Sequence, residues 1–110
     1  MTILQKRAAA RAERREQLRQ ETRQRLRQSL GVLLPGAKVL VFGSLTRPYR
    51  FQEDSDVDVA LFAEPSHLSL LALTGELEER VGCPADVILL DRCRFKAKVL
   101  KEGEIWTSSS

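Results

Sequence analysis

The stretch that decides the fold reads VLVFGS at residues 39–44 and, after eleven intervening residues, DVDVALF at residues 56–62. The first run is apolar and ends in a Gly-Ser pair, which is typical of a strand followed by a turn. The second run opens with two carboxylates spaced two residues apart. Residues i and i+2 of a strand point to the same face, so Asp56 and Asp58 are expected to project side by side, while the valines beside them face the core.

Two carboxylates about 7 Å apart along a strand repel each other unless a cation lies between them. Mg²⁺ prefers oxygen ligands and keeps coordination positions open for substrate phosphates. The turn at Gly43-Ser44 offers a phosphate free backbone N–H groups, no Cβ at the glycine, and a hydroxyl. The two runs together therefore predict a site for a metal ion and a nucleotide.

Each of these features also has a simpler interpretation. The Asp-x-Asp pair is compatible with the solvated face of an amphipathic strand, and the Gly-Ser pair with an ordinary turn. A third carboxylate, Asp86, opens a later apolar run and taken alone is compatible with a loop residue. The conjunction of all three favours the metal-nucleotide site. The sequence contains neither the GxxxxGK[ST] loop nor the GxGxxG loop of other nucleotide-binding proteins.

This combination resembles the DNA polymerase beta superfamily of nucleotidyltransferases, and most closely its minimal nucleotidyltransferase branch. The pattern there is Gly-Ser, a short loop that contains Arg, an Asp-x-Asp that opens a strand, and a third Asp on a later strand. The counterparts here are Gly43, Ser44, Arg47, Asp56, Asp58 and Asp86. The resemblance covers residues 30–106. Pro48 stands where the family often has Gly, and the loop up to Asp56 is slightly longer than usual.

The resemblance implies a catalytic role and metal binding for Asp56, Asp58 and Asp86, with two Mg²⁺ ions or Mn²⁺ in their place. It implies nucleotide binding by Gly43-Ser44 and Arg47, with ATP or another nucleoside triphosphate as substrate. An exposed arginine without a ligand is the alternative for Arg47.

The resemblance also implies a partner. Many minimal nucleotidyltransferases pair with a helical HEPN-domain protein as the antitoxin of a toxin–antitoxin system, and some transfer AMP to a tyrosine of that partner. Two alternatives stay open. The chain is either a non-catalytic antitoxin that neutralises its partner by contact, or a nucleotidyltransferase that acts on a small molecule or RNA.

Length and composition predict one small cytoplasmic domain. The chain has 110 residues, its apolar runs are too short to cross a membrane, and no signal-peptide pattern opens it. Its two cysteines, Cys83 and Cys93, and its single histidine, His67, match no zinc or disulfide pattern, so both thiols are expected to be reduced and structural. An oligomer is compatible with the sequence.

The charge is distributed unevenly. Residues 1–30 carry nine Lys and Arg against three Glu, a net charge of +6, whereas the remaining eighty residues carry nine basic and twelve acidic groups, a net charge of −3. A basic segment of this kind is usually a solvated helix face. Binding to nucleic acid or to an acidic partner is the second interpretation.

The expected fold is α/β, with a mixed (α+β) sheet of the polymerase-beta type and a long N-terminal helix. Residues 3–30 contain no Gly or Pro and predict a helix with a packing stripe at Leu18, Thr22, Leu26 and Leu30, ended by Gly31. Strands are predicted at 38–42, 57–62, 86–90 and 104–106, and helices at 68–81 and 91–100, the first with its leucines facing inward and Gly82 as its C-terminal cap. The predicted divisions are a basic helix (1–30), a nucleotidyltransferase domain (31–106) and a disordered tail (107–110).

Overall fold

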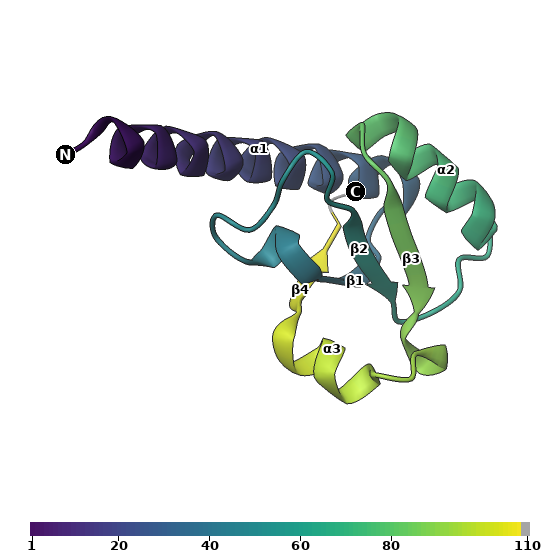
Figure 1. The fold of residues 1–110 in the computed structure, drawn as a ribbon. Helices are drawn as coiled ribbons and strands as arrows, with labels where there is room; N and C mark the ends of the chain where they lie inside the picture. The colour runs from purple at the N-terminus through teal and green to yellow at the C-terminus, as the bar shows by residue number, and fades with distance from the viewer. Residues whose placement is uncertain (109–110) are drawn as a thin grey trace.

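The computed structural model describes residues 1–108 and confirms the mixed α/β fold with a long N-terminal helix. Figure 1 shows the arrangement of its elements. The elements in chain order are α1 (Ile3–Leu33), β1 (Lys38–Phe42), the 3₁₀ turn η1 (Gly43–Thr46), β2 (Val57–Leu61), α2 (Leu70–Val81), β3 (Ala85–Leu89), the 3₁₀ turn η2 (Leu90–Arg92), α3 (Lys96–Glu102) and β4 (Glu104–Thr107).

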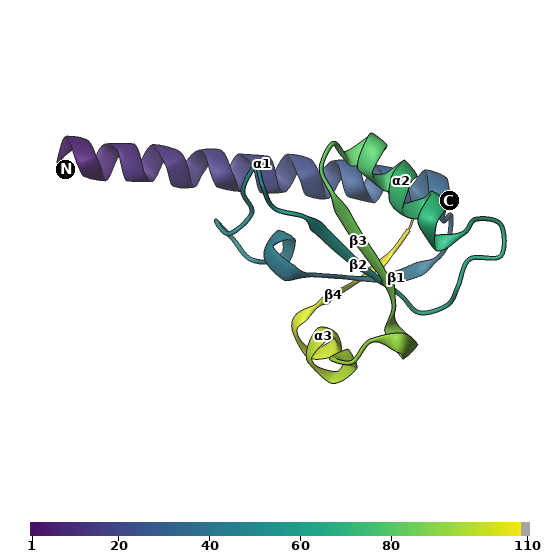
Figure 2. The same ribbon diagram turned by 45° about the vertical axis from the view of Figure 1, so that its right-hand side comes forward.

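The four strands form one sheet in the order β3-β2-β1-β4. The strand β1 is antiparallel to both of its neighbours, β2 and β4, whereas β2 and β3 are parallel. The parallel pair is joined by α2, the crossover that parallel strands require. Figure 2 shows the twisted sheet lying beneath α1 and α2.

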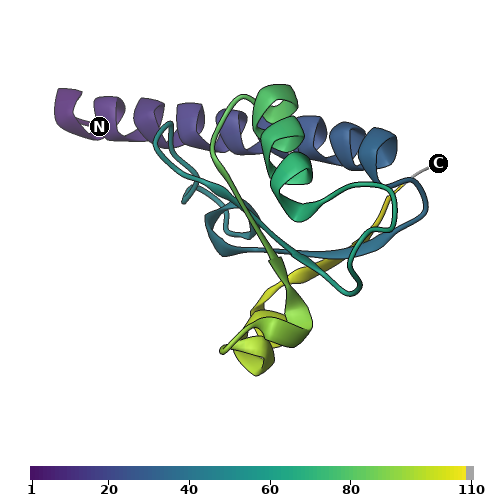
Figure 3. The same cartoon turned by 90° about the vertical axis from the view of Figure 1, so that its right-hand side faces the viewer.

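The two faces of the sheet bury different sets of side chains. On one face Val39, Val57 and Val59 pack with apolar residues of α1 and α2 in the larger core. On the other face Leu40 and Ala60 pack with residues of η2 and α3 in a smaller core. Figure 3 shows α1 and α2 on one side of the sheet and α3 on the other. Alternation along β2 therefore assigns Asp58 to the face of Ala60, opposite α1 and α2.

The helix α1 begins with a capping box between Thr2 and Gln5 and runs past the predicted end at Gly31. The prediction that Gly31 ends the helix is wrong. Leu30 and Leu34, on either side of this glycine, are buried in the larger core. Burial of these side chains outweighs the cost of about 1 kcal/mol that a glycine imposes within a helix.

Only the C-terminal half of α1 packs on the domain. Thr22, Leu26 and Leu30 of the predicted stripe are buried, and Leu18 is half-buried against the core. Residues 3–17 are almost all exposed and project beyond the sheet, which gives the molecule its length of 55 Å (Figure 1). We call residues 3–17 the arm.

The helix α2 confirms the predicted C-terminal cap and corrects one leucine. The Ser69 hydroxyl accepts the Ala72 N–H, and Gly82 ends the helix in the left-handed conformation. Leu73 and Leu77 are buried, but Leu71 is 86% exposed, so its predicted place in the core is wrong. The core seam follows residues 70, 73, 77 and 81, and Leu71 lies one helical step, about 100°, away from it.

The predicted basic helix at 91–100 is two short pieces, η2 and α3, separated by extended backbone at Cys93. Each piece buries one apolar residue of its own, Leu90 and Val99, against the smaller core. A single straight helix cannot direct both side chains to the same patch of the sheet while its chain turns back into β4.

The predicted tail from residue 107 is wrong for the two residues of it that the structure describes. Thr107 belongs to β4, and Ser108 is buried, with its N–H donating to the Ala37 carbonyl at 2.8 Å. Thr107 is paired with Lys38 of β1, and Ser108 is bonded to Ala37 just before that strand, so both residues are fixed on the sheet. Residues 109–110 lie outside the described part of the chain, and the division at residues 30 and 31 stays a prediction.

Two further expectations concern the whole molecule. Among the described residues, no helix has both the length and the apolar character needed to cross a membrane. Cys83 and Cys93 are free and half-buried. Burial, with the nearby Asp56 charge, raises the pKa of the Cys83 thiol, which keeps it protonated at neutral pH.

We predict that Leu26→Asp unfolds the domain, whereas deletion of residues 1–14 barely changes its stability. Leu26 is fully buried, and an unpaired carboxylate at such a position costs several kcal/mol, comparable with the roughly 5–15 kcal/mol that stabilises a small domain. The matched control is Val32→Asp, at a position of the same helix that is 61% exposed. Thermal unfolding followed by circular dichroism measures all three, and a cooperative, native-like transition in Leu26→Asp would contradict the assignment of the core.

Candidate functional site

The register of β2 brings two of the predicted carboxylates together. Asp58 in β2 and Asp86 in β3 are directly paired neighbours across the parallel strands. Asp56 precedes Asp58 by two residues, just before β2 begins. All three therefore belong to one end of the sheet, and the charges of Asp86 and Asp56 both act on Asp58.

Gly43 lies against this group from the other side of β2. Asp58 is paired with Phe42, the residue before Gly43, so the glycine backbone passes close to the Asp58 side chain. A Cβ on Gly43 would collide with the Asp58 Oδ2 atom and come within 3.2 Å of its Cγ atom. Gly43 also has a φ of 78°, in the left-handed region that other residues rarely adopt. Glycine is required here for both reasons.

The turn that carries Gly43 and Ser44 is held by its own hydrogen bonds and by α1. The Thr46 hydroxyl donates to the Gly43 carbonyl at 2.7 Å, and the Arg47 N–H donates to the Ser44 carbonyl at 3.1 Å. From α1, Arg19 and Arg23 donate to the Leu45 carbonyl at 2.9 and 3.2 Å. The long helix thus fixes the position of the predicted phosphate-binding turn.

Arg23 extends the same network to β4. It forms a double hydrogen bond with Glu104, at 2.9 and 3.3 Å, and its guanidinium lies 5.1 Å from the centre of the Trp106 ring. Arg27 stacks on the same ring at 4.2 Å. Trp106 is buried, and the two arginines lie over its ring.

The loop between η1 and β2 is anchored to α1 through its backbone. Tyr49 has a φ of 65°, unusual for a residue with a side chain, and its N–H donates to the Glu16 carboxylate at 2.9 Å. Burial opposes ionisation of Glu16, but the hydrogen bond from Tyr49 and contacts with Gln20 and Arg19 outweigh it and hold its pKa below the usual value. Glu16 is therefore a charged anchor at neutral pH.

Arg47 lies on the outside of this loop. Its guanidinium is 3.5 Å from Glu102 of α3, and both side chains are largely exposed. An exposed pair of this kind contributes little to stability and opens readily. Contact of Arg47 with a phosphate stays a prediction.

Asp58 is the electrostatic centre of the site. Its partial burial, followed by the charges of Asp86 and Asp56, raises its pKa from 3.8 to about 6. A half-buried carboxylate with two like charges beside it is stabilised by a cation, which removes the repulsion and replaces lost hydration.

The donor set fits a divalent cation in its chemistry, because all three side chains offer carboxylate oxygens and two of them are paired across neighbouring strands. The side chains are not gathered into a closed ligand shell. Among residues 1–108, no three or more His, Cys, Asp or Glu side chains already stand in a metal-holding arrangement. The predicted metal-binding roles of Asp56, Asp58 and Asp86 therefore stay predictions.

The sequence alone did not identify Glu16, Arg19 and Arg23 as residues that support the site. They occur within a helix rich in Arg, Gln and Glu, where ten of the seventeen residues from 11 to 27 are charged. The one available signal was that Arg19 and Arg23 lie next to the apolar stripe of α1 rather than opposite to it. Arg19 is 7% exposed, the most buried charged residue among those described.

Comparison with protein families gives one match. The family model described as "Polymerase beta, Nucleotidyltransferase" matches residues 36–110, more than half of the chain. The matched segment contains the glycine-serine turn and all three carboxylates. No curated protein and no solved structure matches the chain.

We predict that Asp58→Asn makes the stability of the ligand-free domain less dependent on pH. The folded state holds the Asp58 proton more tightly than the unfolded state, so this group favours folding below pH 3.8, and its contribution is lost as the pH rises through about 6. The uncharged amide of asparagine does not titrate, so the variant should not lose this contribution to stability as the pH rises. Urea unfolding across this pH range measures the effect.

The control for this prediction is Asp91→Asn. The hydrogen bond from Lys96 lowers the pKa of the exposed Asp91 carboxyl. Replacing Asp91 should therefore not reduce the loss of stability as the pH rises. Identical pH profiles for the parent and Asp58→Asn would contradict the raised pKa.

Proposed function

The chain belongs to the polymerase beta nucleotidyltransferase family, and on this premise we propose that it transfers AMP from ATP to a hydroxyl group of a partner protein. The observation that carries the proposal is the pairing of Asp58 with Asp86 beside Gly43. The half-buried Asp58 carboxylate next to the Asp86 charge disfavours the folded state, so an apolar residue in place of Asp58 would serve a purely structural sheet better. Two neighbouring carboxylates are expected where they bind a cation and, through it, a substrate.

The glycine-serine turn is proposed to bind the β- and γ-phosphates. Backbone N–H groups approach an anion closely only where no Cβ intervenes, and Gly43 satisfies this condition. Ser44 adds a hydroxyl, and Arg47 adds a guanidinium once it leaves its exposed pair with Glu102. The bonds from Arg19 and Arg23 to Leu45 support this role, since they make the turn rigid before a nucleotide arrives.

Asp56, Asp58 and Asp86 are proposed to hold the metal. Two Mg²⁺ ions bound there would neutralise charge on the triphosphate and on the attacking and leaving oxygens. The raised pKa of Asp58 supports this role, because a group that is hard to ionise alone becomes a full ligand when a cation offsets its neighbours. Mn²⁺ has the same ligand preference.

In the proposed reaction the acceptor oxygen forms a bond to the α-phosphorus of ATP. The bond from that phosphorus to the oxygen bridging the α- and β-phosphates breaks, and pyrophosphate leaves with the bonding pair. The acceptor proton passes to a carboxylate, for which Asp86 is the candidate because it is exposed at the open edge strand. Asp58 lies between β1 and β3 and is suited to binding rather than to proton transfer.

A protein acceptor is favoured by the shape of the described site. The carboxylates lie at one end of the sheet, where Asp86 is exposed, and within residues 1–108 no second domain encloses that end. An acceptor that carries its own binding surface fits such a site. The proposal extends to a cytoplasmic HEPN-domain partner and an antitoxin role, as in the minimal nucleotidyltransferases that the chain resembles. Neutralisation by contact alone, or transfer to RNA or a small molecule, are the competing functions.

We predict that ATP with Mg²⁺ raises the melting temperature of the parent chain, and that Asp56→Asn combined with Asp58→Asn abolishes the rise. A ligand that binds only the folded state stabilises it by mass action, about 2.7 kcal/mol at a hundredfold excess over Kd. The matched control is Glu64→Gln with Asp91→Asn, which removes two exposed carboxylates elsewhere. An undiminished shift in the Asp56 and Asp58 variant would show that the site is wrongly assigned.

We predict that, with α-labelled ATP and Mg²⁺, the parent chain labels the protein encoded by the adjacent reading frame, and that Asp86→Asn does not. The label is read after denaturing electrophoresis, so only covalent transfer counts. If Asp86→Asn neutralises the partner as well as the parent chain does and no label appears on the partner, the function is binding of the partner and not nucleotidyl transfer. Labelling of RNA in place of protein would overturn the proposed acceptor.

A further inference from the structure

The packing seam of α1 continues into the arm without anything to cover it. The seam residues that contact the domain are followed, toward the N-terminus, by Arg15, Arg11, Ala8 and Leu4 at alternating steps of four and three residues. This spacing keeps side chains on one face of a helix and is typical of helix–helix packing. Leu4 is 76% exposed. The arm therefore presents a helix-packing face to solvent.

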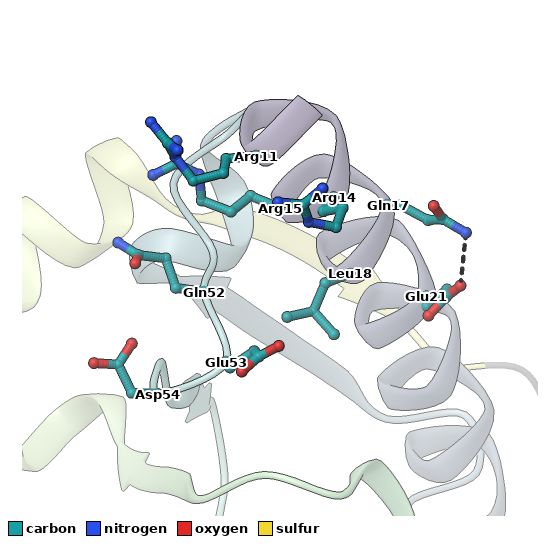
Figure 4. A pocket seen from close by; sticks show the side chains of 9 residues that line it. All are labelled: Arg11, Arg14, Arg15, Gln17, Leu18, Glu21, Gln52, Glu53 and Asp54. Carbon is teal, nitrogen blue, oxygen red and sulfur yellow. Dashed lines mark hydrogen bonds between the residues drawn. The ribbon is translucent and has the colours of Figure 1, made fainter. Parts of the chain in front are cut away.

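A cleft of about 630 Å³ lies beside this face (Figure 4). Arg11, Arg14 and Arg15 form its wall on α1, and Glu53 and Asp54 belong to the loop on its other side. Within residues 1–108 no ion pair joins the two walls. The Nε atom of Arg15 is buried and, among the described residues, has no hydrogen-bond partner. A buried donor without a partner destabilises the folded chain, so a ligand that offers it an acceptor is favoured.

The exposed face of α2 repeats the spacing of the arm. Leu71, Gly75, Glu78 and Gly82 are separated by four, three and four residues, as are Leu4, Ala8, Arg11 and Arg15. All four α2 residues are exposed, and a Cβ on Gly75 would meet nothing within 4 Å. At the third position of each face an arginine, Arg11, corresponds to a glutamate, Glu78, and each face has a leucine at its first position and a small residue at its second.

We propose that the arm of one chain packs in parallel on α2 of a second copy of this chain. In this pairing Leu4 lies on Leu71. Ala8 lies on Gly75, and because one residue has only a methyl group and the other has no side chain, the helices can approach closely. Arg11 faces Glu78 and its neighbour Glu79. Arg15 reaches the C-terminal end of α2, where a helix leaves carbonyl groups unpaired and favours a cation.

The direction of the helices permits a closed dimer. Within one chain α2 crosses α1 obliquely and runs back toward its N-terminal side (Figure 1). An arm parallel to the partner's α2 therefore runs obliquely against the direction of the partner's α1, an arrangement that a twofold axis between the two chains permits. Both arms engage at once under this symmetry, so the assembly ends at two chains instead of growing into a fibre.

The mixed charge of the cleft favours a helix over a nucleic-acid strand. A phosphate backbone would satisfy the arginine wall but would meet Glu53 and Asp54 on the other side. The second copy's α2 carries Arg80 next to Glu79, so it brings a cation as well as carboxylates. The inference is independent of the proposed function, because it concerns association of the chain with itself.

Sedimentation equilibrium of the full chain, without nucleotide, tests the proposal. We expect a dimer for the parent and a dissociation constant raised about tenfold or more by Arg11→Glu or by Glu79→Arg, since each places like charges in contact. Combining the two substitutions restores the opposite-charge pair and should recover most of the association. Lys98→Glu, an equal change of charge on the exposed face of α3, should leave it unchanged.

Gly75→Leu separates association from folding. Leucine has a higher helix propensity than glycine, so the monomer should be as stable as the parent or more stable. The leucine side chain should at the same time block the approach of the arm. A parent chain that stays monomeric, a dimer insensitive to all three substitutions, or Arg11-dependent binding of a single-stranded RNA oligonucleotide by a monomer would each overturn the proposal.

Discussion

The register of β2 is the constraint on which the rest of this structure depends. The strand is antiparallel to β1 and parallel to β3, and it places its valines in the larger core and Asp58 on the opposite face. A slip of one residue would exchange the two faces, burying the carboxylate under α1 and α2 and exposing the valines. Hydrophobic burial therefore fixes the position of the carboxylates, although they take no part in it. The pairing of Asp58 with Asp86 is a consequence of packing on the other side of the sheet.

The long helix α1 serves both the core and the candidate site. Its apolar seam stabilises the sheet, while Glu16, Arg19 and Arg23 bind the turn and the loop that lead to Asp58. These contacts are made to backbone groups, which do not depend on the side chains of the loop. The anchored groups lie on both sides of Pro48, at Leu45 and at Tyr49, so α1 holds the loop where Tyr49 takes its left-handed conformation.

The uneven charge of the chain has two parts with different physical roles. Arginines in the second half of α1 make contacts within the molecule, with the Leu45 carbonyl, the Glu104 carboxylate and the ring of Trp106. Arginines of the arm have no such partners among the described residues and remain available to another chain. A count of charges over residues 1–30 treats both groups alike, so it cannot separate intramolecular support from a binding surface.

The sequence by itself determined the strands, the C-terminal cap of α2 at Gly82, and the candidate residues Gly43, Ser44, Asp56, Asp58 and Asp86, because each depends on neighbours close in the chain. Local patterns failed at Gly31 and Leu71, where burial by distant residues decides whether a helix continues and which side chain is covered. They gave no sign that Asp58 faces Asp86 directly, or that Arg19 binds the Leu45 carbonyl. Only the tertiary structure decided these, since both contacts join residues 26 or more positions apart, and which distant residues meet depends on how the whole core packs.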